Sequence, residues 1–294
     1  MKFALCQELF VGWEFDRQCE YIARTGYDGI EIAPFSLVGE AVDPTTLTPA
    51  KRQELRRAIE DHGLDCVGLH WLLAKTEAFE TFHLTTADRT VRDRTADYFR
   101  RLAELCRDLG GRVLVLGSPQ QRSLQPGVSR EQADDHAIAV IEAALPTLEQ
   151  TGTVLCLEPL SPAETDYMNS CAEARVLIDR LGSPHVRLHQ DVKAMLGEPS
   201  GTPLPELIRD FADVTAHFHA NDRNLLGPGM GDVDFGPIFA ALRETGYEGC
   251  VSVEVFDLTP GPEAIAERSL DYMQTVIQTV MQTVMKSASA ETAS

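Results

Sequence analysis

The sequence predicts a single-domain α/β protein, a closed (β/α)8 barrel built from residues 1–285. Three observations lead to this prediction. Eight short β-rich runs alternate with helical patterns, one helix-to-strand junction recurs, and 294 residues are enough for eight such units. The junction is clearest where "TGYDGIEIAP" (25–34) returns as "TGYEGCVSVEV" (245–255), each with a glycine that marks the end of a helix before a strand.

The eight expected strands begin after turn residues or a helix stop. Their expected first residues are Lys2, Gly29, Leu64, Arg112, Thr153, His185, Val214 and Cys250. Because a helical pattern lies between each pair, the strands should be parallel and joined by right-handed crossovers. Eight such units favour a closed barrel over an open doubly wound sheet. No GxGxxG or GxxxxGKS/T motif follows any strand, which argues against nucleotide binding.

Helices are expected where apolar residues recur at i, i+3 and i+4. The clearest such segments are 49–62, 87–109 and 130–150. The last helix is expected over about 261–285. Its apolar segment "VIQTVMQTVM" (276–285) would pack on the barrel or, in a homo-oligomer, on a second subunit. The small, polar segment 286–294 is expected to be a disordered tail.

Composition argues against several classes of partner. The net charge is −19, and a surface this acidic repels phosphate backbones and anionic lipids, so neither nucleic acid nor a membrane is expected as a partner. No apolar run reaches membrane-spanning length. The seven cysteines are scattered without a CxxC motif, and the N-terminal "MKFALCQELF" is a poor signal peptide. Both features indicate a cytoplasmic protein.

Residues that can bind metal ions stand at the ends of four consecutive expected strands. In a (β/α)8 barrel the active site lies at the carboxyl ends of the strands. Here these ends carry Glu158, Asp191, the pair His217 and His219, and Glu254. Side chains alternate along a strand, so each end residue shares a face with the residue two positions earlier. If that face lines the lumen, two Glu, one Asp and one His converge at the mouth of the barrel.

Three carboxylates in one mouth repel one another unless a cation lies between them. Three oxygen ligands and one imidazole suit Mn²⁺, Mg²⁺ or Co²⁺, with Zn²⁺ as an alternative. The lack of thiolates at these positions argues against a structural zinc site. Each residue taken alone has a simpler interpretation, as a solvated side chain, a helix cap or a buried histidine. Four such residues at one level of four consecutive strands favour the metal site.

Four segments in this order and spacing resemble a known family. They are "LEPLSPAETDYMN" (157–169), "LHQDVKAM" (188–195), "HFHANDRN" (217–224) and "GYEGCVSVEVF" (246–256). The chain is similar to the xylose-isomerase-like TIM-barrel superfamily, in the sugar isomerase/epimerase branch that includes D-tagatose 3-epimerase and inosose dehydratase. The resemblance implies an isomerase or epimerase that uses one divalent metal ion on a small-molecule sugar (ketose) or cyclitol. Carboxylates would move a proton next to a metal-polarised carbonyl.

The resemblance also implies roles for individual residues. The metal ligands would be Glu158, Asp191, His219 and Glu254, which selects the second histidine of the HxH pair over the first. Glu158 and Glu254 would also be the catalytic acid and base on opposite faces of the substrate. Glu164 matches a glutamate that binds a substrate hydroxyl.

The sequence departs from the epimerase pattern at two positions. Where that pattern has a histidine three residues after the Asp ligand, this chain has Ala194, with Lys193 beside it. Where it has an arginine six residues after the ligand His, this chain has Leu225, and Arg223 comes two residues earlier. Lys193, Arg223 and Asn221 are therefore expected to be this chain's own substrate contacts.

Two other segments border the expected mouth. In "GLHWLLA" (68–74), His70 and Trp71 point to opposite faces. Either Trp71 stacks on a sugar and His70 binds a hydroxyl, or both only pack the barrel. Arg122, after the fourth expected strand, is expected to be solvated rather than to bind an anion. Glu31, between two isoleucines, is expected in a buried ion pair.

Three functions are compatible with these residues. The first is the metal-dependent isomerase or epimerase. The second is a lyase on the same metal site, inosose dehydratase-like or keto-glycoside-cleaving, which starts with the same proton abstraction and then expels a β-substituent. The third is a non-catalytic sugar-binding protein, against which the complete ligand set argues.

Overall fold

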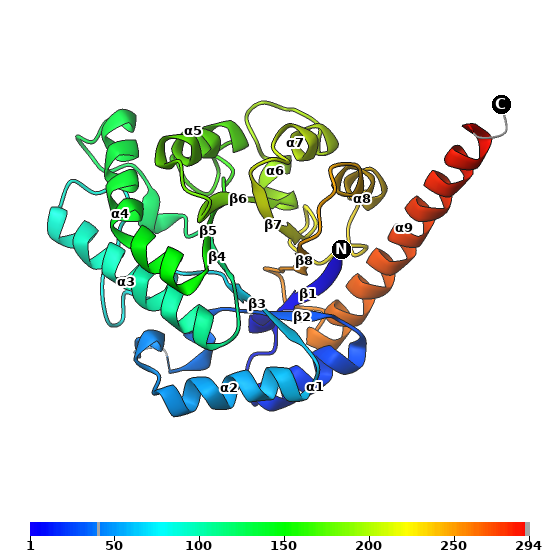
Figure 1. The fold of residues 1–294 in the computed structure, drawn as a ribbon, viewed down its shortest axis with the longest axis horizontal. Helices are drawn as coiled ribbons and strands as arrows, with labels where there is room; N and C mark the ends of the chain where they lie inside the picture. The colour runs from blue at the N-terminus through cyan, green and yellow to red at the C-terminus, as the bar shows by residue number, and fades with distance from the viewer. Residues whose placement is uncertain (40–41, 292–294) are drawn as a thin grey trace.

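The computed structural model describes residues 1–39 and 42–291. Eight parallel strands close into a barrel in chain order, and helices surround it (Figure 1). The strands are β1 Lys2–Cys6, β2 Gly29–Ile32, β3 Asp65–Leu69, β4 Val113–Leu116, β5 Val154–Leu157, β6 Val186–Asp191, β7 Thr215–Ala220 and β8 Cys250–Val253. The predicted fold is confirmed, and every strand begins within one residue of its expected start.

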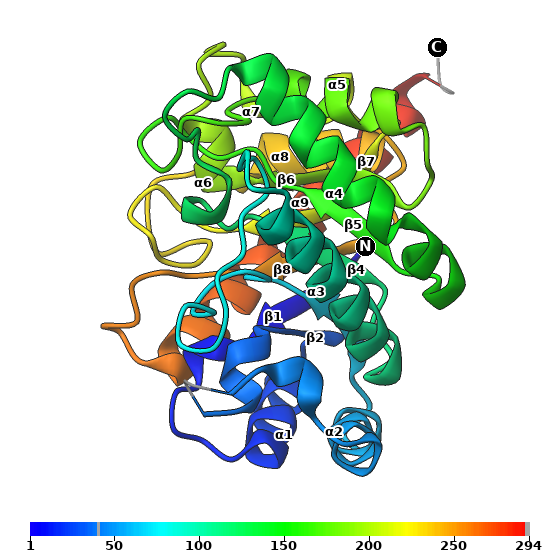
Figure 2. The ribbon, with the colours of Figure 1, turned by 90° about the vertical axis from the view of Figure 1, so that its left-hand side faces the viewer.

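The helices follow the predicted alternation. They are α1 Phe15–Thr25, α2 Pro49–Asp61, α3 Arg89–Asp108, α4 Arg130–Thr151, α5 Cys171–Leu181, α6 Val192–Leu196, α7 Leu204–Asp210, α8 Phe235–Glu244 and α9 Pro262–Glu291. Single 3-10 turns are η1 Gln7–Leu9, η2 Pro34–Leu37, η3 Pro44–Thr46 and η4 Gln120–Arg122. Helices α3 and α4 lie side by side on the outside of the barrel (Figure 2).

Local sequence sets where these helices begin and end. A capping box starts α4, because Ser129 and Gln132 each bond the other's backbone N–H. The recurring junction depends on glycine in the left-handed region, with φ of +106° at Gly26 and +72° at Gly246. The same kind of turn therefore leads from the preceding helix into β2 and into β8.

Alternation along the strands separates the two faces of the barrel wall. In β6, Gln190 points outward and its amide donates to the Leu207 carbonyl of α7 (3.1 Å). Its neighbour His189 points inward, where its ring centroid lies 5.2 Å from that of His217 and 4.2 Å from that of His219. The lumen-facing set expected from the sequence is therefore the one that the fold produces.

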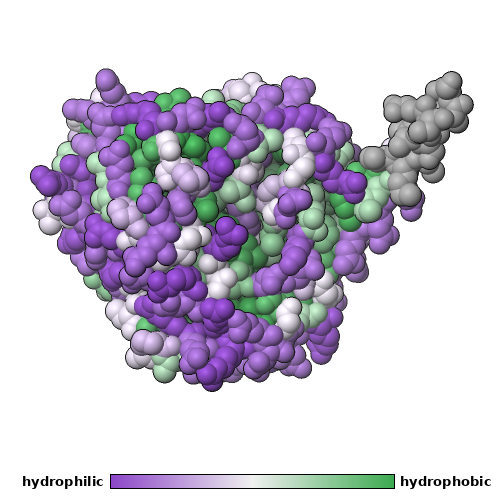
Figure 3. Space-filling model, viewed as in Figure 1, coloured by the Kyte–Doolittle hydropathy of each residue, from purple (hydrophilic) through white to green (hydrophobic). Residues whose placement is uncertain are grey.

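No helix in the described part of the chain has the length and apolar character needed to span a membrane. Hydrophilic residues cover most of the face shown in Figure 3, with hydrophobic residues in smaller areas between them.

Helix α9 extends to Glu291, six residues beyond the expected end at 285, and its last turns project from the body (Figure 1). Val276, Ile277 and Val280 pack against the core, whereas Met281 is 44% exposed. Residues 292–294 of the predicted tail lie outside the described residues. Contact of α9 with a second subunit stays a prediction.

Candidate active site and metal centre

The four candidate ligands lie at the carboxyl ends of β5 to β8. Asp191 ends β6 and is paired in register with His219 of β7, while Glu158 and Glu254 directly follow β5 and β8. All four are buried. The ligand atoms of Asp191, His219 and Glu254 lie within 4.8 Å of one another, and so do those of Glu158, His189 and Asp191. The fold thus brings the four predicted residues into two trios that share Asp191, and His189, which was not predicted as a ligand, completes the trio of Glu158.

Burial acts to raise the pKa of each of the three carboxyl groups, and neighbouring charges then make their proton affinities very different. Burial and the charges of Glu254 and Asp191 raise the pKa of Glu158 to about 8. Burial also raises the pKa of Asp191 to about 6, although the Lys193 ammonium opposes the rise. Burial acts in the same direction on Glu254, but the His219 charge overcomes it and lowers the pKa of Glu254 to about 2. Negative charge is therefore crowded most severely around Glu158.

The Glu158 carboxylate receives no hydrogen bond from any residue that the structure describes. Its backbone carbonyl accepts a bond from the buried Arg122 guanidinium (2.6 Å). Gly117 of the neighbouring strand end makes room for the carboxylate, because an added Cβ would lie 1.7 Å from Glu158 Oε2. This buried carboxylate accepts no hydrogen bond and lies beside two more carboxylates and an imidazole. Together these groups form a set of ligands that suits a divalent cation.

Glu31 fixes the orientation of His219. The Glu31 carboxylate lies 3.0 Å from His219 Nε2 and 2.7 Å from His217 Nε2. His219 Nδ1 faces the other way and lies 3.2 Å from Glu254 Oε2. The expected buried ion pair of Glu31 is therefore present, and it leaves Nδ1 as the His219 nitrogen that faces the carboxylates.

Asp191 is fixed in a similar way. Its Oδ1 accepts a bond from the Ala194 N–H at the start of α6 (2.7 Å), and its Oδ2 accepts one from the Asn221 amide. Asn221 is itself fully buried and accepts a bond from the Lys193 N–H (2.8 Å). The sequence suggested Asn221 as a substrate contact, but its side chain contacts the candidate ligand Asp191 instead.

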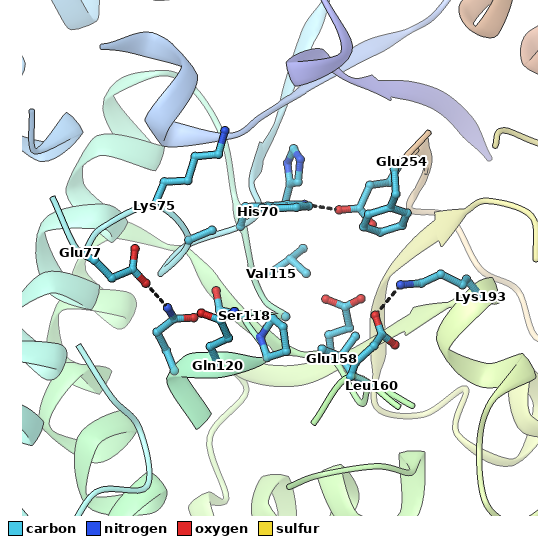
Figure 4. A pocket seen from close by; sticks show the side chains of 17 residues that line it. His70, Lys75, Glu77, Val115, Ser118, Gln120, Glu158, Leu160, Lys193 and Glu254 are labelled. Atoms are coloured by element: carbon cyan, nitrogen blue, oxygen red, sulfur yellow. Dashed lines mark hydrogen bonds and ion pairs between the residues drawn. The ribbon is translucent and has the colours of Figure 1, made fainter. Parts of the chain in front are cut away.

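A pocket of about 420 Å³ opens beside the carboxylates and is lined by four of the six predicted substrate contacts (Figure 4). These are His70, Trp71, Glu164 and Lys193, and the candidate ligands Glu158 and Glu254 line it as well. Trp71 adopts a left-handed backbone, with φ +53°, and its Nε1 donates to Glu254 Oε1 (2.7 Å). Such strain in a non-glycine residue is typical of a functional position. The Lys193 ammonium forms an ion pair with Glu164 (2.6 Å).

His70 is more deeply placed than Trp71. Its ring is fully buried, with Nε2 3.0 Å from Glu8 Oε2 and Nδ1 3.6 Å from Glu31. His70 therefore lines the pocket and also packs inside the barrel, and its contact with a substrate hydroxyl stays a prediction.

Arg223, like Asn221, is a predicted substrate contact that does not line this pocket. It is exposed and lines a separate pocket beside Asp232. The turn after β7 explains this position: buried Asp222 accepts backbone N–H bonds from Arg223 (2.7 Å) and Val233 (3.2 Å), and Leu225 has φ +69°. This turn directs the chain away from the mouth.

Other functional features were missed or misjudged from the sequence. Arg122 is 1% exposed rather than solvated, and burial lowers its pKa to about 10. Gly117, Leu160 and Phe256 line the pocket but were not singled out. For Gly117 a signal existed, since the β4–β5 register pairs Leu116 with Leu157 and so sets Gly117 beside Glu158.

Sequence comparison finds relatives at about a quarter identity. The chain is 26% identical over 286 residues to 3-dehydro-D-guloside 4-epimerase of Escherichia coli, covering 94% of this chain and 100% of the relative. It is 25% identical over 250 residues to D-psicose 3-epimerase of Enterocloster bolteae, covering 84% and 79%.

Solved structures share the fold. A D-psicose 3-epimerase crystallised in the presence of D-fructose superposes with a TM-score of 0.80 at 21% identity, covering 94% of this chain and 99% of that one. An L-ribulose 3-epimerase gives a TM-score of 0.80 at 21% identity, covering 97% of each chain. The family model described as "Xylose isomerase-like TIM barrel" matches residues 19–276. The chain therefore belongs to the xylose isomerase-like TIM-barrel family.

Proposed function

We propose that the protein is a divalent-metal-dependent epimerase or isomerase of a sugar or cyclitol. One observation carries the proposal: three carboxylates and an imidazole converge in a buried position at the mouth of the barrel, beside a pocket. The similarity to sugar epimerases at about a quarter identity supports the same class of reaction.

Glu158, Asp191, His219 and Glu254 would hold the metal ion, with His219 binding through Nδ1. Mn²⁺, Mg²⁺ or Co²⁺ suits this oxygen-rich set best. When bound, the ion would polarise the substrate carbonyl and so acidify the neighbouring C–H. Asn221 and Glu31 keep two of the side chains in the required orientation.

Glu158 and Glu254 are the acid–base pair in this proposal. Glu158 has no hydrogen-bond donor among the described residues, and in the metal-loaded site, where the cation would have displaced its own proton, its carboxylate could take a proton from the carbon next to the carbonyl. Glu254 is held by the Trp71 indole and lies elsewhere on the pocket wall (Figure 4). Return of a proton to the opposite face from Glu254, once that carboxylate has taken a proton from solvent, would invert the carbon.

The rest of the pocket would orient the sugar. Glu164 and Lys193 form a polar pair that can exchange hydrogen bonds with hydroxyls. Trp71 and Phe256 pack against each other, with ring centroids 6.1 Å apart, and both line the pocket, where they offer an apolar surface for the C–H side of a sugar ring.

A lyase is the second candidate. The observation that favours it is that Arg223 lies outside the pocket and that Ala194 offers no polar group, whereas the Lys193 ammonium lines the pocket. A cation at this position could donate a proton to a leaving β-substituent after the same first proton transfer.

The test is a panel of ketoses, aldoses, inososes and 3-keto-glycosides incubated with Mn²⁺ or Co²⁺ in D₂O. Epimerisation conserves mass apart from solvent deuterium, whereas a lyase releases water or an aglycone, so mass spectrometry and NMR separate the two. Glu158→Gln should lower activity by about 10³-fold or more, because one residue is both ligand and acid–base group.

Glu248→Gln is the matched control, since Glu248 is exposed and far from the mouth, between α8 and β8. If no compound exchanges a proton, or if both variants behave alike, the proposal is wrong.

A further inference from the structure

The pocket reaches well beyond the candidate ligands. Figure 4 shows Glu158, Glu254 and Lys193 at one end and Lys75, Glu77 and Gln120 at the other. The second end is formed by the segments that follow β3 and β4. We call it the distal subsite, lined by Ala74, Lys75, Glu77, Pro119, Gln120 and Gln121.

The pocket volume exceeds what one sugar needs. At about 420 Å³ the pocket could hold about fourteen water molecules at liquid density. A hexose at the packing density of a protein interior would fill roughly half of this space. A free sugar placed over the carboxylates would therefore leave the distal subsite empty.

The distal subsite has an apolar body and a polar edge. Ala74 and Pro119 continue the apolar wall that begins with Trp71. At the far end, Gln121 Nε2 donates to Glu77 Oε1 (2.7 Å). A ring with an apolar face and a polar outer edge, such as a phenol or a second sugar, matches this pattern.

The charges argue for a neutral group in the distal subsite. Lys193, at the other end, is paired with Glu164. The Lys75 ammonium lies over the Phe35 ring, 4.3 Å from its centroid, rather than beside the Gln121–Glu77 pair. The Glu77 carboxylate at the far edge would repel a phosphate or carboxylate group.

We propose that the substrate is a keto-glycoside, with its keto sugar over the candidate ligands and its neutral, ring-shaped aglycone in the distal subsite. This inference rests on the proposed function for the chemistry at the keto sugar. Occupation of the distal subsite by the aglycone is a separate claim that binding alone can test.

The first experiment measures binding by calorimetry on the Mn²⁺-loaded full chain. The probes are methyl β-D-glucoside, phenyl β-D-glucoside and cellobiose. The phenyl glucoside or cellobiose should bind at least about 10-fold more tightly than the methyl glucoside, as is usual for filling an apolar pocket. Whichever binds more tightly identifies the kind of aglycone. Equal affinity for all three probes would overturn the inference, whether or not the protein is an epimerase.

The second experiment fills the subsite. Ala74→Phe should reduce the affinity ratio of ring-bearing to methyl glycoside about 10-fold. It should reduce the ratio of kcat/KM for a 3-keto-glycoside to that for the free 3-keto sugar to a similar extent. Ala78→Phe is the control, because Ala78 is exposed in the same segment and does not line the pocket, so it should leave both ratios unchanged.

An unchanged affinity ratio in Ala74→Phe also overturns the inference. Absence of turnover with every sugar, together with the expected affinity ratios, would remove the proposed function and leave the subsite standing.

Discussion

Glu158 and Glu254 are the same residue type at the mouth of one barrel, yet their surroundings move their pKa values apart, to about 8 and about 2. The difference comes from their neighbours. Glu254 faces His219 and the Trp71 indole, whereas Glu158 faces carboxylates and lacks a donor among the described residues. Two carboxyl groups with separated proton affinities are the usual arrangement for an acid and a base in one site.

The raised pKa of Glu158 predicts a pH-dependent metal affinity. Below about pH 8 the metal-free carboxyl holds a proton, and a metal ion has to displace it, so affinity should rise with pH and level off above that value. Between about pH 6.5 and about pH 8.5 the dissociation constant for Mn²⁺ should fall about 25-fold.

Calorimetry in two buffers of different ionisation enthalpy would measure the constant and count the protons released. Affinity that is constant over this range would contradict the assignment of Glu158 as a ligand.

Glu31 should raise the metal affinity of the site through its contact with His219 Nε2. In Glu31→Gln the charged partner of His219 Nε2 is lost, and metal affinity should fall about 10- to 100-fold, as for other outer-shell carboxylates. The visible spectrum of the Co²⁺-loaded variant should shift, because the imidazole is a weaker, reoriented ligand. Glu248→Gln should change neither property. A spectrum identical to that of the unmodified protein would show that Glu31 only packs the barrel.

At the scale of elements, the strands were predictable and the loops were not. Buried parallel strands carry nearly continuous apolar runs, so β5 to β8 and the polar residues that end them could be identified from the chain itself. The direction of Arg223 depends on the turn around Asp222, whose bonds reach across to Val233. The burial of Arg122 depends on the Glu158 carbonyl, 36 residues away. Neither long-range contact leaves a local pattern.

Gly117, which follows β4, should set the position of the Glu158 carboxylate, which follows β5. In Gly117→Ala the new Cβ would overlap Glu158 Oε2, so the carboxylate has to move away from its present position. Metal affinity should fall at least about 10-fold while the far-ultraviolet circular dichroism stays unchanged. Gly39→Ala is the control, because a Cβ there meets nothing within 4 Å. Unaltered metal binding in Gly117→Ala would mean that Glu158 is not a ligand.

The turn after β7 should depend on Asp222. Its carboxylate is fully buried and accepts three backbone N–H bonds, from Arg223, Asp232 and Val233. Asp222→Ala should therefore lower the free energy of unfolding by about 3 kcal/mol. Asp232→Ala, an exposed neighbour, should change it by less than about 0.5 kcal/mol. Urea denaturation measures both, and equal effects would refute this role of Asp222.

At the scale of the whole molecule, the candidate ligands join four consecutive strands, which is half of the closed barrel. A bound ion would therefore link β5, β6, β7 and β8 to one another. The sequence could predict this convergence because strand order equals chain order in such a barrel, so neighbouring strand ends are neighbours in space.

Metal binding should consequently stabilise the entire fold. With Mn²⁺ at about 100 times its dissociation constant, the free energy of unfolding should rise by about 2.7 kcal/mol. A chelator should reverse the gain, and Glu254→Gln should largely remove it. Calorimetric melting with and without Mn²⁺ measures the effect. A melting temperature indifferent to Mn²⁺ would argue that no ion binds the folded chain.

Gly117 changes how family members can be compared. The Glu158 carboxylate occupies the space that a side chain at this position would need. A homologue could therefore keep all four candidate ligands and still lose the site through one methyl group at this position. The presence of the four ligand residues is thus not enough to identify a homologue with an intact metal site. The residues that leave space beside each ligand have to be present as well.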